Sequence, residues 1–338
     1  MPRPLLAHAV SARLRQPVIS IGNLAFGGRG KTPLVAAVAR LLQAAGERPA
    51  ILSRGYGRRR AEDGAVIVSD GTHVLADVDR AGDEPLLLAR SVPGAVVVVC
   101  DQRAVAGALA ERVCGATVHV LDDGFQHRAL ARDLDLVLVS PRDVADRSVP
   151  LGRLREPLSA LARADAIVVD DDPAPRSDLD AEAPAVDAAG RGRGDRAPLP
   201  LPAGSPAAVF RLVRALGAPV PLEPDRAWPG VDPGVVAVAG IASPSRFVRA
   251  LEGRGVRVAY ALEYRDHHRY TARDLAHIAR AAARAGVPAV VTTAKDAVRL
   301  LPLRPFPLPI AAAPLEASVD EGETFRSWLF ARLAEARP

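Results

Sequence analysis

The segment PVISIGNLAFGGRGKTP, residues 17–33, decides the fold class. It begins with an apolar run typical of a buried strand and continues as a glycine-rich turn that leads into a helix-like stretch. Glycines let the backbone turn successive N–H groups toward an anion, and the N-terminus of a helix attracts negative charge. The order of strand, turn and helix therefore predicts a phosphate-binding loop.

The residue types in this loop suit a nucleotide. Lys31 can reach the β- and γ-phosphates, and the Thr32 hydroxyl can hold magnesium. The strict P-loop pattern places its first glycine at position 25, where this chain has Ala25, so the match is a variant. A glycine-rich turn without a ligand is the alternative. The residues that we expect to bind the nucleotide are Gly27, Gly28, Arg29, Gly30, Lys31 and Thr32.

Apolar runs recur along the first half of the chain, separated by amphipathic stretches of helix length. The runs after the first are residues 50–52, 95–99, 118–121, 134–139 and 166–169. This alternation predicts an α/β fold in which a P-loop-type, mostly parallel sheet is flanked by helices.

A change in composition divides the chain. Residues 170–204 are rich in Asp, Ala, Pro, Gly and Arg and lack hydrophobic periodicity, which favours a flexible linker or surface excursion. Strand-like and helix-like runs then resume and predict a second, smaller α/β domain. We therefore expect a nucleotide-binding domain over 1–169, a linker over 170–206 and a smaller domain over 207–338 that completes the active-site cleft.

Charge and cysteine content exclude several classes of protein. The 44 basic and 39 acidic residues give a net charge of +5, which suits anionic small ligands or membrane surfaces as readily as nucleic acid. Cys100 and Cys114 form neither a disulfide framework nor a zinc motif. No apolar run approaches the roughly 18 residues that span a bilayer, and no cleaved signal is expected. A reducing cytosol fits these observations.

Only two of the basic residues, Lys31 and Lys295, are lysines. A site that keeps a compact, flexible ammonium in an arginine-rich chain can require that geometry. Lys295 lies in the segment TTAKDA, residues 292–297, which resembles a guanine-reading motif only superficially. ATP is therefore favoured over GTP.

Two carboxylates, Asp122 and Asp123, follow the apolar run 118–121. Open α/β sheets bind ligands at the carboxyl ends of their strands, and an aspartate there orients magnesium in P-loop proteins. The alternative is a turn in which an aspartate caps the next segment. His127, a few residues further on, is uninformative alone.

Two other motifs contain groups that can transfer protons. In Gly82-Asp-Glu-Pro85 the favoured interpretation is that Asp83 caps a helix, although its carboxylate could also accept a hydroxyl proton. In the segment YRDHHRYT, residues 264–271, Asp266 could orient His267 for proton transfer or to steady a catalytic carboxylate. Capping and surface-loop roles compete equally there.

Together these motifs resemble the tetraacyldisaccharide 4'-kinase family of Gram-negative bacteria over most of residues 17–300. The segments that carry the resemblance are Gly22-Asn through Gly-Lys-Thr-Pro33, Ser53-Arg-Gly-Tyr-Gly57, Gly82-Asp-Glu-Pro85, Asp101-Gln-Arg103, Leu121-Asp-Asp-Gly-Phe-Gln-His127, Leu154-Arg-Glu-Pro-Leu158, Ala237-Val-Ala-Gly-Ile241, Asp266-His267 and Thr293-Ala-Lys-Asp-Ala-Val298.

The resemblance implies transfer of the ATP γ-phosphoryl group to the 4'-hydroxyl of tetraacyldisaccharide 1-phosphate, giving lipid IVA in lipid A (lipopolysaccharide) biosynthesis. Magnesium is the implied cofactor. Lys31 and Thr32 are implied to contact phosphate and metal, Asp83 to be the base, and His267 to partner it across the cleft. Further implied roles are the metal neighbourhood or substrate for Glu84, Asp122 and Asp123, and substrate or phosphate support for Arg103, His127, Arg155 and Glu156.

The resemblance also implies partners and a location. The acceptor is an anionic glycolipid at the cytosolic face of the inner membrane, and neither nucleic acid nor a protein partner is implied. Members of the family usually begin with a hydrophobic anchoring helix, whereas sixteen residues precede Pro17 here, so we expect peripheral attachment. Arg54 and residues 58–60 are candidates to meet the acceptor or headgroups, with a solvated loop as the equal alternative. Ala294 stands where a glutamate is usual.

Two other functions remain open at this stage. A P-loop switch ATPase or GTPase that regulates a protein partner fits the variant loop and the doubled aspartate. A catalytically silent protein that binds the membrane surface is the third possibility, suggested by the missing anchor and by Ala294.

Overall fold

The chain divides into two units, which are described separately. The computed structural model describes residues 11–27, 30–59, 64–170, 201–202, 204–205 and 208–337. Of these described residues, the first unit contains those up to 213 and those from 317 onward, and the second contains 214–316. The predicted linker over 170–206 and the loop residues Gly28 and Arg29 fall largely or wholly outside the described residues.

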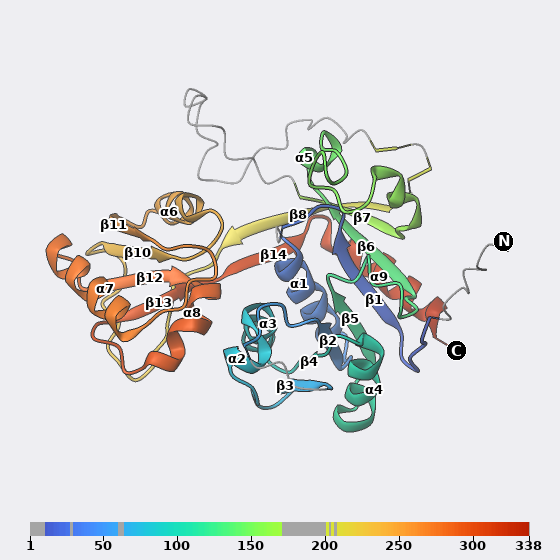
Figure 1. The fold of residues 1–338 in the computed structure, drawn as a ribbon, viewed down its shortest axis with the longest axis horizontal. Coiled ribbons are helices and arrows are strands. Elements are labelled where there is room, and N and C mark those ends of the chain that lie inside the picture. The colour runs from blue at the N-terminus through green and yellow to red at the C-terminus, as the bar shows by residue number, and fades with distance from the viewer. Residues whose placement is uncertain are drawn as a thin grey trace, which may run out of the picture. The chain divides into compact units, whose positions relative to one another are not determined.

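The first unit is built on a nine-stranded sheet (Figure 1). In spatial order its strands are β14 (Leu315–Val319), β8 (Ala208–Leu216), β7 (Ala166–Asp170), β6 (Leu134–Val139), β1 (Val18–Asn23), β5 (Val118–Asp122), β2 (Pro49–Ser53), β4 (Val96–Val99) and β3 (Val66–Asp70). The neighbouring pairs from β8 through to β4 are parallel, and β3 runs antiparallel to β4.

Helices accompany this sheet, because parallel strands need crossover connections and hide both faces. The helices of the first unit are α1 (Lys31–Ala44), α2 (Val78–Ala81), α3 (Asp83–Ser91), α4 (Arg103–Cys114), α5 (Pro141–Val144), the 3-10 helix η1 (Leu158–Arg163) and α9 (Gly322–Ala336). The central strands β1, β5, β2 and β4 are buried along their whole length, as the continuous apolar runs predict.

The parallel arrangement brings several polar residues to one edge of the sheet. Strand β1 ends at Asn23, β2 at Ser53 and β5 at Asp122, and the three strands are neighbours. Each is followed by a segment that leads into the next element, so the carboxyl edge collects the phosphate-loop candidates and the acidic pair.

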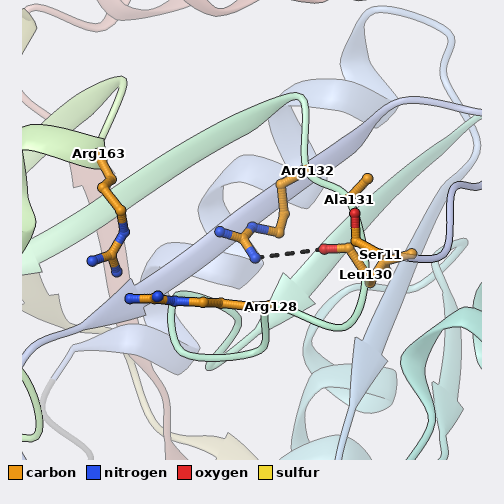
Figure 2. Close-up of a pocket in the computed structure, with 6 residues that line it drawn as sticks. All are labelled: Ser11, Arg128, Leu130, Ala131, Arg132 and Arg163. Atoms are coloured by element: carbon orange, nitrogen blue, oxygen red, sulfur yellow. Dashed lines mark hydrogen bonds between the residues drawn. The ribbon is translucent and has the colours of Figure 1, made fainter. Parts of the chain in front are cut away.

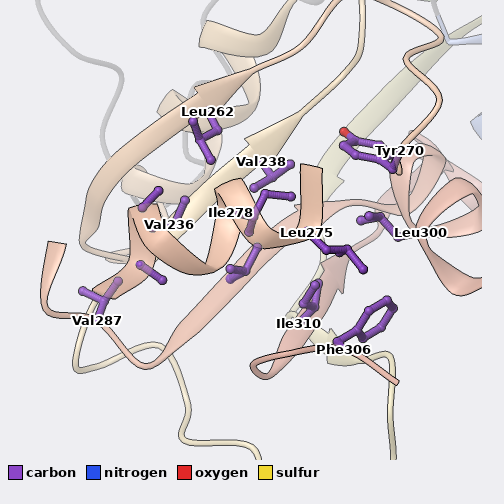
Figure 3. Close-up of a cluster of buried hydrophobic side chains, with 13 residues drawn as sticks. Val236, Val238, Leu262, Tyr270, Leu275, Ile278, Val287, Leu300, Phe306 and Ile310 are labelled. Carbon is purple, nitrogen blue, oxygen red and sulfur yellow. The ribbon is translucent and has the colours of Figure 1, made fainter. Parts of the chain in front are cut away.

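The second unit has its own five-stranded sheet, in which β9 is antiparallel and the other strands are parallel. The strands in spatial order are β11 (Val258–Glu263), β10 (Val235–Ala239), β12 (Ala289–Thr293), β13 (Ile310–Ala313) and β9 (Val220–Pro221). Its helices are α6 (Pro244–Glu252), α7 (Ala272–Ala285), α8 (Ala294–Leu300) and the 3-10 helix η2 (Leu301–Leu303). Figure 3 shows the core in which Leu275 and Ile278 of α7 pack toward Val236 and Val238 of β10.

The α/β class with a mostly parallel, helix-flanked sheet is confirmed. The division of the chain differs from the expected boundary at residue 207, because β8 pairs with β7 and the C-terminal helix α9 belongs to the first unit. Aromatic packing accounts for this, since the Phe210 ring of β8 lies 4.9 Å from Phe325 and 5.4 Å from Trp328 of α9. Among the described residues, none of the helices combines the length and apolarity that a bilayer span requires.

Candidate active site

Two glycines of the turn between β1 and α1 have backbone angles that other residues rarely adopt. Gly27 and Gly30 have φ angles of 105° and 79°, in the region that favours glycine. A Cβ on Gly30 would lie 2.9 Å from Leu138 and 3.1 Å from Asp170, so a side chain has no room there. Helix α1 begins directly after Gly30, which places Lys31 and Thr32 at its N-terminus.

Lys31 is buried and reaches two oxygens at the edge of the sheet. Its Nζ donates to Asn23 Oδ1 at 3.0 Å and to Asp123 Oδ1 at 2.7 Å. The ammonium therefore lies beside the end of β1 and the segment that follows β5. This is the place that a bound phosphate chain would occupy in a loop of this type.

Arg155 approaches the same oxygens. Its guanidinium donates to both oxygens of Asp123, at 2.9 and 2.7 Å, and to Asn23 Oδ1 at 2.5 Å. Gln126 Nε2 donates to the Asn23 carbonyl at 3.0 Å and helps to fix that residue. Two cations thus converge on one carboxylate and one amide oxygen.

Asn23 is a residue whose importance the sequence analysis missed. The available signal was its position as the last residue of the strand that precedes the glycine-rich loop. Its side-chain oxygen joins Lys31 and Arg155, and its amide donates to the Gly27 carbonyl at 3.3 Å. Asn23 therefore ties the loop to both cations.

Asp123 is held as an anion in an unusual backbone conformation. Its φ of 56° lies in the left-handed region, which aspartate tolerates better than most residues. Burial alone would raise its pKa, but the hydrogen bonds from Arg155 and the charge of Lys31 hold the pKa well below its usual value. The carboxylate therefore stays ionised and occupies the point where the two positive groups meet.

Asp122, the neighbouring carboxyl, has the opposite shift. Burial and the nearby charge of Glu84 raise the pKa of Asp122 to about 7, against the opposing effect of Lys31. Ser53 Oγ donates to its Oδ2 at 3.2 Å. Adjacent carboxyls whose pKa values are pushed apart are typical of sites that perform acid, base or metal chemistry.

The residues present fit a magnesium ion. Within the described ranges, no group of three or more His, Cys, Asp or Glu side chains is placed to hold a metal by itself. Mg²⁺ needs fewer protein ligands, because it binds through one or two carboxylates, waters and substrate phosphates. The buried Asp122, raised in pKa partly by Glu84, is an oxygen donor whose ionised form a cation would favour.

The helix α3 starts with Asp83 and Glu84. The capping role favoured for Asp83 in the sequence analysis is wrong, because Gly82 takes the N-cap position with φ 86° and Asp83 is the first helical residue. A Cβ on Gly82 would lie 2.8 Å from the Tyr56 carbonyl oxygen, so only glycine fits at the cap. Asp83 is therefore not needed as the cap that the sequence suggested.

Arg103 and His127 interact electrostatically with each other, and Arg103 also interacts with the acidic pair Asp122 and Asp123. Arg103 is buried at the start of α4, where its Nη1 donates to the Asp101 carbonyl at 2.9 Å, and it interacts electrostatically with Asp122 and Asp123. Burial and the charge of Arg103 lower the pKa of His127, so its neutral form is favoured.

Glu156, the last of the predicted support residues, is paired elsewhere. Its carboxylate lies 3.0 Å from a guanidinium nitrogen of Arg128 and 3.0 Å from one of Arg163. The structure therefore separates the consecutive residues Arg155 and Glu156. Arg155 belongs to the group formed with Asn23, Lys31 and Asp123, which we call the phosphate-loop cluster. Glu156 pairs with two surface arginines.

The second unit holds His267 in a cluster of its own. His267 has φ 59°, and its Nε2 lies 3.4 Å from Lys295 Nζ, which in turn lies 3.6 Å from Asp266. Arg299 Nη2 lies 3.4 Å from the other ring nitrogen of His267. Thr271, the last residue of the segment 264–271, caps α7, and its hydroxyl accepts from the Asp274 amide.

The first-unit cluster defines a class of protein. A glycine-rich loop, a buried lysine at a helix N-terminus and two carboxylates at the carboxyl edge of a parallel sheet are the parts of a P-loop-type nucleotide phosphotransferase. A model of the tetraacyldisaccharide-1-P 4'-kinase family (LpxK) matches residues 5–334. The chain belongs to this family.

Individual relatives agree with this family. A tetraacyldisaccharide 4'-kinase of Anaeromyxobacter sp. (strain Fw109-5) is 43% identical over 314 residues, covering 92% of this chain and 81% of the relative. One from Anaeromyxobacter dehalogenans (strain 2CP-C) is 45% identical over 294 residues, covering 86% and 74%. The crystal structure of LpxK from Aquifex aeolicus in complex with ATP matches with a TM-score of 0.72 and 29% identity, covering 96% of this chain and 90% of that one.

Proposed function

We propose that this chain, as a member of that family, transfers the γ-phosphoryl group of ATP to the 4'-hydroxyl of tetraacyldisaccharide 1-phosphate. The product is lipid IVA, and the reaction belongs to lipid A biosynthesis. The observation that carries the proposal is the convergence of Lys31 and Arg155 on Asp123 beside the glycine-rich loop.

Lys31 is the residue that we assign to the nucleotide phosphates. Its ammonium is held next to the loop by Asn23 and Asp123, so a phosphate oxygen can replace one of these partners with little movement of the side chain. Arg155 keeps Asp123 ionised and paired during that exchange. Phosphoryl transfer depends mainly on positioning and charge stabilisation, which fixed cations and loop amides supply.

Magnesium is the cofactor that we assign to this reaction, with Thr32, Asp122 and Glu84 as the residues that would hold it. Asp123, which the resemblance also implied for the metal, is instead bonded to Lys31 and Arg155. When bound, the ion neutralises charge on the β- and γ-phosphate oxygens. Asp122 must lose its proton to take part. Its pKa of about 7 places that loss near neutral pH.

We assign the general base to Asp83 and its partner to His267 of the second unit. Asp83 would accept the proton of the 4'-hydroxyl as the phosphoryl group is transferred, and His267 would steady the carboxylate. General-base assistance is worth roughly 10²- to 10⁴-fold in rate, so it supplements the positioning by the phosphate site. Arg103 and His127 are assigned to acceptor or phosphate support.

The location that we propose is the cytosolic face of the inner membrane, with peripheral attachment. The acceptor is an anionic glycolipid, and arginine side chains attract such headgroups. Arg54 lies 3.6 Å from Asp101 and its side chain is 72% exposed, so it is a candidate for this contact. The Arg58 side chain, 3.9 Å from the same carboxylate, is only 8% exposed and is a poor candidate.

The direct test is an acceptor-dependent kinase assay. Purified protein with ATP, magnesium and tetraacyldisaccharide 1-phosphate should give a lipid with one added phosphate, located at the 4'-position by tandem mass spectrometry. The Lys31→Ala variant serves as the matched control and should give almost none. ATP hydrolysis that needs no acceptor and is stimulated by a protein would contradict the proposal and support a switch ATPase.

A further inference from the structure

A pocket of about 370 Å³ in the first unit is lined by three arginines. Its lining residues are Ser11, Arg128, Leu130, Ala131, Arg132 and Arg163 (Figure 2). None of the three arginines belongs to the phosphate-loop cluster. We propose that this pocket binds the 1-phosphate group of the acceptor, an inference that rests on the proposed function.

One carboxylate organises two of the guanidinium groups. Glu156 accepts from Arg128 Nη2 at 3.0 Å and from Arg163 Nη2 at 3.2 Å, and it does not itself line the pocket. Figure 2 shows the three guanidinium groups directed toward the same region. The shared carboxylate thus holds two like charges close together and offsets their repulsion.

Arg128 and Arg163 keep N–H donors that can bind an anion. A guanidinium carries five N–H groups in a planar fork, and the bonds of Arg128 and Arg163 to Glu156 use one nitrogen of each. The fork geometry matches the spacing of phosphate oxygens, which is why arginine predominates where phosphate is recognised by paired hydrogen bonds. A phosphate monoester, with two negative charges, suits a pair of such groups.

Two of the lining arginines, Arg132 and Arg163, are held in place by contacts of their own. Arg132 donates to Asp135 from Nε at 3.3 Å and from Nη2 at 3.1 Å, and its Nη1 donates to the His127 carbonyl at 3.0 Å. The Arg163 guanidinium lies 4.6 Å from the centroid of the buried Phe125 ring. Groups that are fixed before binding lose little entropy when the ligand arrives.

The chain connects this pocket directly to the phosphate-loop cluster. Glu156 follows Arg155, which binds Asp123, and Phe125 lies two residues after Asp123. The acceptor in the name of the family carries a phosphate at position 1 and reacts at the 4'-hydroxyl of its other sugar. A second anion site within the same unit would therefore fix one end of the disaccharide while the other end meets ATP.

The test measures binding of the acceptor without nucleotide, so that it does not depend on turnover. Calorimetric titrations in detergent micelles compare tetraacyldisaccharide 1-phosphate with the same lipid bearing a free 1-hydroxyl. The variants are Arg128→Ala, Arg163→Ala and Arg128→Lys, with Arg326→Ala, a partly exposed arginine of α9 outside the pocket, as the matched control. Thermal unfolding of each variant checks the fold.

We expect Arg128→Ala and Arg163→Ala to weaken binding of the phosphorylated lipid by roughly tenfold or more, as for loss of a charged hydrogen bond. Binding of the lipid with a free hydroxyl should not change, Arg128→Lys should be intermediate, and Arg326→Ala should match the wild type. Equal weakening with both lipids, or no weakening, would overturn the assignment.

Two further outcomes separate the possible failures. If Arg128→Ala loses affinity for phosphatidylglycerol vesicles while its preference for the phosphorylated acceptor is intact, the pocket takes bilayer headgroups and the assignment is overturned. If phosphate-dependent acceptor binding behaves as expected but the wild-type protein forms no phosphorylated product, the pocket stands and the proposed kinase reaction fails.

Discussion

The two lysines of this chain lie in clusters that can be compared directly. Lys31 meets Asp123 at 2.7 Å in the first unit, and Lys295 lies 3.4 Å from His267 in the second. In each cluster the partner of the lysine has a positive φ, 56° for Asp123 and 59° for His267. Such backbone conformations cost about 1–3 kcal/mol and persist where the surroundings enforce them, often at functional sites.

The difference between the clusters separates two kinds of chemistry. Around Lys31 the contacts are short, and Arg155 adds two more hydrogen bonds to the same carboxylate. Around Lys295 the contacts to His267 and Asp266 are 3.4 and 3.6 Å, and the imidazole is 43% exposed. The arrangement around Lys31 suits a fixed positive charge that binds phosphate. The arrangement around Lys295 suits side chains that change their hydrogen-bond partners during a proton transfer.

Lys31→Ala should have the largest effect on activity, because it removes the fixed charge beside the loop. We expect kcat/KM to fall by about 10²- to 10³-fold, the usual cost of losing one donor that stabilises transition-state charge. Arg155 still pairs with Asp123, so the fold should survive. Steady-state kinetics with a thermal unfolding control measure both, and wild-type turnover in this variant would contradict the phosphate assignment.

Asp83→Ala and His267→Ala test the proton-transfer half of the comparison. Loss of the base should lower kcat by roughly 10²-fold or more. We expect His267→Ala to lower kcat less, because the role proposed for the imidazole is to steady the base and not to accept the proton itself. Single-turnover rates with both substrates saturating give the ranking. A larger loss for His267→Ala than for Asp83→Ala would reverse the two roles.

Lys295→Arg keeps the positive charge of the second cluster and changes only its shape. A planar guanidinium cannot place one compact charge near both His267 Nε2 and Asp266 as the ammonium does. We therefore expect kcat to fall, by less than in His267→Ala, while the KM for ATP stays constant. An enzyme with unchanged kcat would show that the second cluster needs only a positive charge.

Asp122→Asn should change the free energy of unfolding by an amount that depends on pH, while the fold stays the same. The pKa of Asp122 is raised from 3.8 in the unfolded chain to about 7 in the folded one, so the folded state keeps a proton that the unfolded state releases. The wild type should lose free energy of unfolding relative to Asp122→Asn as pH rises through that window, and the difference should level off above it.

Urea unfolding of both proteins across this pH range is the measurement. Burial also raises the pKa of Asp135. Because both proteins contain Asp135, its contribution cancels in the difference between their free energies of unfolding. A difference that does not vary with pH would mean that Asp122 ionises in the folded protein as readily as in the unfolded chain.

Part of the fold was predictable because buried parallel strands are continuous apolar runs. Strands β1, β5 and β12 show this pattern, and each is buried throughout. Strand β3 escaped prediction because it pairs antiparallel at the edge of the sheet, and β14 because it is largely exposed. The membership of α9 in the first unit depends on contacts with Phe210 that no local pattern reveals.

The candidate site was likewise predictable only where local sequence patterns determine it. The order of strand, loop and helix placed Lys31, and the end of β5 placed Asp122, because both follow from local patterns. Arg155 lies 132 positions after Asn23 and 32 after Asp123, and it bonds to both. Contacts between residues so far apart in the chain cannot be predicted from local patterns. The opposite pKa shifts of the two aspartates depend on Glu84 and Arg155 and were equally hidden.

The most direct measurement is a crystal structure of the protein with a non-hydrolysable ATP analogue and magnesium. We expect the β- and γ-phosphates to lie against the amides of residues 27–32, with Lys31 Nζ bonded to a phosphate oxygen and Asp123 still paired with Arg155. An analogue bound elsewhere, with this turn empty and the contact between Lys31 and Asp123 intact, would contradict it.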